Sequence, residues 1–135
     1  MPSKPRTWRP SHLPAVDKSV QEYDHRRGSS RARGYTTAWE KAAAAHKREH
    51  PLCLGCQAVG ELRAVEVVDH VVPHRGDMSV FWHRDLWQSA CRWHHDVIKP
   101  RLEAMRDRGE IGAAELWLDS QPARRLTIQL RPTPV

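Results

Sequence analysis

The stretch CLGC occupies residues 53–56 and the stretch CRWHH occupies residues 91–95, with 34 residues between them. The first holds two cysteines separated by two residues, and the second holds a cysteine and a histidine at the same spacing. A short turn of this kind, a knuckle, presents two ligands to one ion, and structural zinc takes four ligands in a tetrahedron. The sequence therefore predicts a structural zinc (Zn2+) site of the Cys3His type. Its ligands are Cys53, Cys56, Cys91 and His94.

One alternative concerns the fourth ligand, because His95 directly follows His94 and could complete the site instead. The equal spacing of the two knuckles favours His94. A zinc ion here would tie together the two ends of the intervening segment. Such binding contributes on the order of 10 kcal/mol of folding free energy, so chelation is expected to unfold the core.

The size and composition of the chain suit one small domain. Its 135 residues are 39% hydrophobic, which supports only a modest core, so a metal would help it to fold. Three cysteines is an odd number, and no signal peptide precedes them; this favours a reducing, cytoplasmic location. No apolar run reaches membrane-spanning length, and no membrane association is expected. We expect a monomer.

The net charge of +6 points to a polyanionic partner, although an acidic membrane surface or simple solubility would also fit. Residues 1–35 carry +5 of this charge and are rich in proline, arginine, glycine and serine. This composition predicts a basic, flexible arm. The arm either lies along phosphates or is a solvated tail.

The first predicted helix follows Thr37 and Glu40, whose spacing is that of a capping box. Pro51 ends this helix. Residues 65–70 are predicted as a strand, 71–83 as a loop, 86–90 as the returning strand, 94–108 as a helix with a kink at Pro100, and 112–118 as a short helix. Trp82, Trp87 and Trp93 are assigned to packing.

The segment between the knuckles carries a family resemblance. VVDHVVPHRGD at residues 67–77, FWHRDLWQSAC at 81–91 and the CxxHH that ends at residue 95 together resemble the HNH endonucleases of phages and prophages often found near terminase genes. The resemblance covers residues 35–99. It implies an α+β fold of the small, zinc-stabilised treble-clef, ββα-metal (His-Me finger) type with flanking helices. Residues 36–120 would be the nuclease domain and 121–135 a C-terminal tail.

The resemblance also implies a catalytic centre that cleaves DNA. His70 would be the general base, because an imidazole can accept a proton from water near neutral pH. Asp69 and His95 would hold one catalytic divalent metal ion (Mg2+, Mn2+ or Ni2+), and His74 and Arg75 would assist. Adjacent strand residues point to opposite faces, so Asp69 and His70 can serve one site only where the strand ends or bulges.

The chain departs from the family at one position, because it contains no asparagine at all. The residue aligned with the middle letter of HNH is Leu86, which cannot form the hydrogen bonds by which that asparagine fixes the backbone around the base. His83, Asp85 and Gln88 are candidate substitutes. The leading hypothesis is an HNH endonuclease of phage type that acts on DNA, in packaging beside a terminase. The alternatives are a nucleic-acid-binding module without cleavage and an adaptor for the packaging motor.

Overall fold

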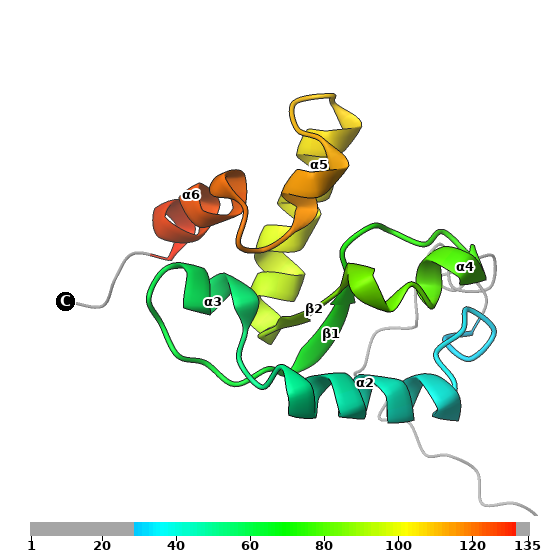
Figure 1. Ribbon diagram of the computed structural model, residues 1–135. Coiled ribbons are helices and arrows are strands. Elements are labelled where there is room, and N and C mark those ends of the chain that lie inside the picture. The colour runs from blue at the N-terminus through cyan, green and yellow to red at the C-terminus, as the bar shows by residue number, and fades with distance from the viewer. Residues whose placement is uncertain (1–28, 132–135) are drawn as a thin grey trace, which may run out of the picture.

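The computed structural model describes residues 29–131 and shows a mixture of helices with one small antiparallel sheet. In Figure 1, α2 lies on one side of the two-stranded hairpin, and α5 and α6 lie on the other. The predicted α+β class is confirmed, and the two strands are followed by a helix as expected. The elements are α2 (Thr37–Glu49), α3 (Leu54–Ala58), β1 (Val67–His70), α4 (Met78–Phe81), η1 (Arg84–Leu86), β2 (Trp87–Ala90), η2 (His94–Ile98), α5 (Lys99–Asp107), η3 (Ala113–Leu116) and α6 (Gln121–Leu130).

The hairpin of β1 and β2 lies at the centre of the domain. β1 pairs with β2 alone, and the register places Asp69 opposite Gln88 and His70 opposite Trp87. The predicted strand was two residues too long at its start, because Val65 bonds instead to Pro51. Within the described residues the outer edge of β1 carries no further strand.

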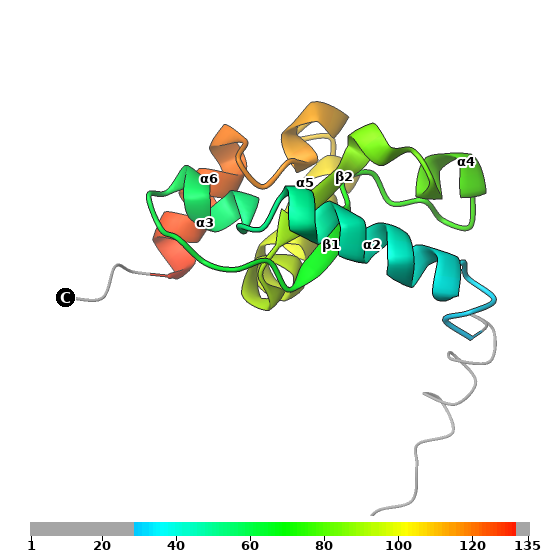
Figure 2. The ribbon, with the colours of Figure 1, turned by 60° about the horizontal axis from the view of Figure 1, so that its bottom comes forward.

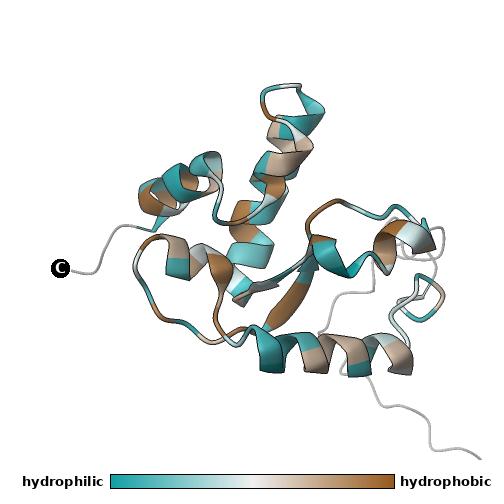
Figure 3. Cartoon of the chain, in the orientation of Figure 1, coloured by the Kyte–Doolittle hydropathy of each residue, from teal (hydrophilic) through white to brown (hydrophobic). Residues whose placement is uncertain are grey.

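α2 forms as predicted, but its start differs from the expected capping box. Thr36 is the N-cap and makes no side-chain cap bond, while Thr37 is already helical and accepts a hydrogen bond from Arg31. The apolar side of α2 packs Trp39 and Ala43 against β1. Its last turn is hydrophilic (Figure 3).

A second apolar core lies beneath α5. Leu102 of α5 and Ile98 of η2 are fully buried with Leu116 and Leu118 from the segment around η3. The predicted short helix at 112–118 is therefore present as a 3-10 turn that closes this core. Burying this apolar surface stabilises the fold by about 25 cal/mol for each Å2 removed from water. The packing thereby fixes α5 relative to the hairpin.

Two predicted segments need correction. The expected loop at 71–83 contains the one-turn helix α4, which Asp77 caps through its side chain. The helix after the second knuckle begins at Arg92, passes through the π-helical turn η2, and continues as α5. Pro100 is the second residue of α5 and directly follows the π-helical turn, so the expected change in helix geometry occurs just before it.

The predicted N-terminal arm and C-terminal tail can be compared with the structure only where its residues are described. Most of the predicted basic arm lies outside the described residues. Residues 121–130, expected as part of a tail, form α6, which packs against α3 (Figure 2). No helix within residues 29–131 combines the length and apolar character that crossing a bilayer would require.

Candidate metal centres and catalytic cleft

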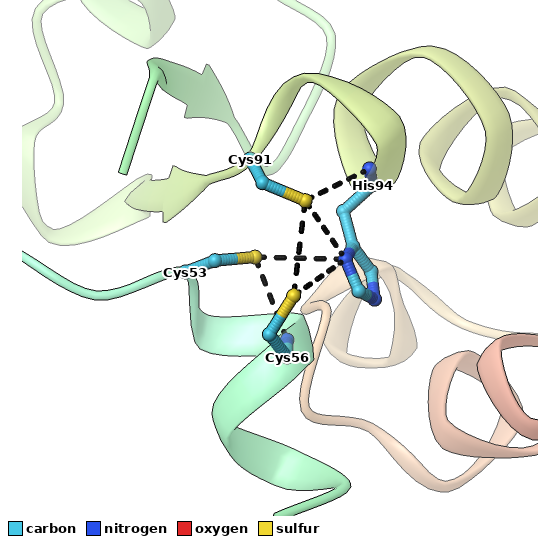
Figure 4. Close-up of side chains that lie close together, drawn as sticks. All are labelled: Cys53, Cys56, Cys91 and His94. Atoms are coloured by element: carbon cyan, nitrogen blue, oxygen red, sulfur yellow. Dashed lines mark hydrogen bonds between the residues drawn. The ribbon is translucent and has the colours of Figure 1, made fainter. Parts of the chain in front are cut away.

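The two knuckles meet in the interior and bring their four predicted ligands together. The ligand atoms of all four residues lie within 4.8 Å of one another (Figure 4), and all four residues are buried. Nδ1 of His94 lies 3.5 Å from the sulfurs of Cys53 and Cys56 and 3.3 Å from that of Cys91. His94, and not His95, therefore occupies the fourth corner.

The spacing of these atoms fits a tetrahedral zinc ion. Usual zinc bond lengths place two sulfurs about 3.8 Å apart and a sulfur and a nitrogen about 3.5 Å apart. The sulfurs of Cys56 and Cys91 are 3.8 Å apart, in agreement with that geometry. The hydrogen bond between Cys53 and Cys91 lowers the pKa of Cys91 and raises the pKa of Cys53, and a bound cation would favour the thiolate form of both. The group could hold a metal ion such as zinc.

The glycine of the first knuckle permits this approach. A Cβ on Gly55 would lie 2.3 Å from Cδ2 of the His94 ring, closer than any real contact. Only a residue without a side chain fits between the knuckle and the imidazole.

The C-terminal helix completes the surroundings of the group. Nε2 of His94 lies 3.0 Å from Oγ1 of Thr127, a residue of α6. Arg131, just after α6, donates to the sulfur of Cys56 at 3.3 Å and pairs with Glu61. A cation next to a thiolate offsets part of the negative charge that three cysteine ligands bring.

A separate cleft of about 640 Å3 runs along the free edge of β1. Five consecutive residues of this edge, 66–70, line the cleft, together with His95. Asp69 and His70 point to opposite faces, and both reach the cleft because β1 ends at His70. The structure thus brings Asp69, His70 and His95 to one cleft.

Asp69 is a buried carboxylate with one oxygen bound by neighbouring side chains and the other directed at His95. Its Oδ2 accepts from Gln88 Nε2 at 2.8 Å and pairs with Lys99 Nζ at 3.1 Å. Its Oδ1 lies 3.7 Å from Nε2 of His95. That distance exceeds a hydrogen bond, yet each atom could bind one shared cation at about 2.1 Å.

His95 is oriented by its neighbour. Its Nδ1 lies 2.9 Å from a carboxylate oxygen of Asp96, which can only accept a hydrogen bond. In the neutral ring Nδ1 therefore carries the proton, and Nε2 presents a lone pair toward Asp69. Asp96 lines the same cleft and is a residue that the sequence analysis did not single out, because a carboxylate beside a histidine carries no distinctive pattern.

His70 is held as a neutral imidazole. Its ring stacks on Trp39 with the ring centroids 4.8 Å apart, and its Nε2 lies 3.1 Å from the carbonyl oxygen of Phe81. Burial lowers the pKa of His70 to about 4, and the nearby His74 adds to the effect. A carbonyl accepts only, so Nε2 carries the hydrogen and Nδ1 is the nitrogen free to accept a proton.

The two residues predicted to assist, His74 and Arg75, lie in different surroundings near His70. His74 has its ring 5.0 Å from that of His70, and its Nδ1 accepts from the backbone N–H of Gly76. Its Nε2 consequently donates to the hydroxyl of Tyr35 at 3.1 Å. Arg75 also lines the cleft, but its side chain is exposed and lies 3.7 Å from the carboxylate of Asp107. Arg75 could therefore add positive charge to the cleft.

The three candidates to replace the missing asparagine lie in different surroundings, and only Gln88 hydrogen-bonds to a residue of the cleft. Gln88 is buried and joins Asp69 to the backbone at Leu116 and Leu118. His83 and Asp85 are exposed and face each other at 3.8 Å. Gln88 therefore positions the carboxylate, and none of the three contacts His70.

The chain is similar in structure to a phage HNH endonuclease. That structure is described as the crystal structure of a deep-sea thermophilic bacteriophage GVE2 HNH endonuclease with manganese ion. The two are 25% identical in sequence, the match covers 71% of this chain and 99% of that chain, and the TM-score is 0.47. No protein-family model and no curated protein matches the chain.

Proposed function

We propose that this protein is a metal-dependent HNH-type endonuclease that hydrolyses phosphodiester bonds of DNA. One observation carries the proposal: a neutral, oriented imidazole, His70, shares a cleft with the facing pair Asp69 and His95. The motifs at residues 67–77 and 91–95, which resemble those of HNH nucleases, support the same function.

The residues divide the chemistry between them. Hydrolysis needs a deprotonated water, and Nδ1 of His70 accepts its proton. Asp69 and His95 would hold a divalent cation, which would supply positive charge for the phosphate and the leaving oxygen. Lys99 and Gln88 hold Asp69 so that one carboxylate oxygen stays directed at His95.

The cleft offers basic side chains to a polyanionic substrate, and four carboxylates balance their charge: Glu66, Asp69, Asp96 and Glu103. Its lining contains four Lys and Arg side chains from separate parts of the fold, and such residues hold phosphates without reading sequence. They are Arg33, Lys47, Arg75 and Arg92. We expect binding of duplex DNA to weaken steeply with salt, by about a hundredfold or more between 50 and 200 mM if several phosphates are neutralised.

The Cys3His group is proposed as a structural zinc site. Four protein ligands fill a tetrahedral ion and leave no position for water or substrate. Metal analysis of purified protein should find one zinc per chain, and Cys91→Ser should lower both the zinc content and the stability. Zinc retained in full by Cys91→Ser would contradict the assignment.

A plasmid-nicking assay tests the nuclease proposal. The parent should nick supercoiled DNA in Mg2+, Mn2+ or Ni2+, and His70→Ala should lose at least about a hundredfold in rate. His83→Ala changes an exposed histidine that does not line the cleft and should cleave like the parent.

Other outcomes separate the alternatives. DNA binding without cleavage in every metal would instead favour a binding module, the interpretation that Leu86 in place of asparagine supports. Weak binding together with no cleavage would favour an adaptor for the packaging motor. The family resemblance extends the proposal to phage or prophage DNA packaging beside a terminase. Co-purification with a terminase subunit tests that role separately.

A further inference from the structure

The carbonyl that orients His70 accepts a second side-chain hydrogen bond. The oxygen of Phe81 lies 3.1 Å from Nε2 of His70 and 2.9 Å from Nε1 of Trp87. Phe81 is the last residue of α4, where a helix leaves its carbonyls without backbone partners. A carbonyl oxygen has two lone pairs, so it can accept from both rings at once.

The sheet register explains why the two rings reach one atom. His70 and Trp87 are opposite one another across β1 and β2, so their side chains lie on the same face of the sheet. Their ring centroids are 6.4 Å apart at an interplanar angle of 82°. Trp87 is 4% exposed and Phe81 is fully buried, so water cannot readily replace a lost indole hydrogen bond.

We propose that Trp87 is a positioning residue for His70. Its indole N–H fixes the Phe81 carbonyl, the carbonyl holds Nε2–H of His70, and Nδ1 is left as the nitrogen that accepts a proton. Leu86, the residue before Trp87, has no hydrogen-bonding side chain, so in this chain the polar contact comes from the next position. The catalytic consequence rests on the proposed nuclease function.

Trp87→Phe removes the donor and keeps an aromatic ring. We expect kcat for DNA cleavage to fall by about tenfold or more while KM stays within about twofold, since misplacing a reacting group slows the chemical step. Trp82→Phe is the matched control. Trp82 packs on the same Phe81 and Trp87 rings, and none of its hydrogen bonds within residues 29–131 reaches the Phe81 carbonyl. It should keep the parent kcat.

Nitrogen-15 NMR of the His70 ring reads the same contact without any cleavage. The parent should show a single neutral tautomer with a hydrogen-bonded Nε2 proton. Trp87→Phe should shift this signal or broaden it by exchange, and Trp82→Phe should not. If the parent proves not to cleave DNA, the nuclease proposal fails while the NMR comparison still decides the positioning role.

Two results would overturn the inference. One is a Trp87→Phe protein that keeps the parent kcat and an unchanged His70 spectrum. The other is equal loss of kcat in Trp87→Phe and Trp82→Phe, which would indicate packing alone. Should Trp87→Phe not fold, benzothienylalanine at position 87 keeps the indole shape without the N–H and gives the same comparison.

Discussion

His94 and Thr127 share a hydrogen bond of 3.0 Å that joins the Cys3His group to the C-terminal helix α6. The Thr127 hydroxyl donates its own proton to the carbonyl of Ala123 at 2.8 Å, so toward His94 it can only accept. The proton of His94 therefore sits on Nε2, and Nδ1 faces the three thiols as a ligand. A residue 33 positions away thus sets the tautomer of the proposed zinc ligand.

Thr127→Val should weaken zinc binding by about ten- to a hundredfold, because it removes the acceptor that holds the imidazole. Competition with a chromogenic chelator measures the affinity. Thr127→Ser keeps the hydroxyl and should bind zinc nearly as the parent does. Equal affinities of the valine and serine variants would show that the hydroxyl does not act on the site.

Gly55→Ala should disrupt the Cys3His group, because the added methyl would meet the His94 ring at 2.3 Å. We expect substoichiometric zinc in the purified protein and a clear loss of thermal stability. Gly112→Ala is the control, since a Cβ there meets nothing within 4 Å and its φ is −93°. An alanine at position 55 that retains a full zinc content would contradict the observed packing.

Lys99→Met should lower the free energy of unfolding by about 3 kcal/mol, because it leaves the buried Asp69 carboxylate without its cation. The two side chains are 3% and 6% exposed, so solvent screens the pair little. Urea denaturation at saturating zinc measures the loss. Glu103→Gln removes the exposed partner of the same lysine and should cost less than about 1 kcal/mol. Adding Asp69→Asn to Lys99→Met should restore part of the stability.

Stability should fall on acidification partly through His46. Burial and the charge of His50 lower the pKa of His46 in the folded protein. The unfolded chain therefore takes up a proton as the pH drops below about 6.5 while the folded chain resists it, so stability is greatest above that pH and declines below it.

His46→Gln should lose less stability than the parent between about pH 7.5 and 5.5. Both proteins keep the same thiols, so protonation of the Cys3His group cancels in the comparison. Parallel stability curves would rule out a contribution from His46. Urea denaturation at several pH values provides the measurement.

The metal-ligand pattern could be predicted from sequence because it is local. Cysteine and histidine at fixed spacing within a turn identify Cys53, Cys56, Cys91 and His94, and the folded chain brings those four side chains together. The paired strands follow equally from a β-branched run and its partner. The predicted start of α2 was wrong because Thr36 and Thr37 are both suitable caps, and local sequence does not distinguish neighbours of the same type.

The residues that orient Asp69 and His94 come from distant parts of the sequence and could be identified only from the tertiary structure. Gln88, Lys99 and Thr127 look like ordinary helix or strand residues, and their contacts with Asp69 and His94 exist only because distant segments pack together. Asp69 and His70 reach one cleft because β1 ends at His70, the last residue that pairs with β2. Ligand identity is a property of single side chains, whereas orientation depends on groups that only the folded core brings within hydrogen-bond distance.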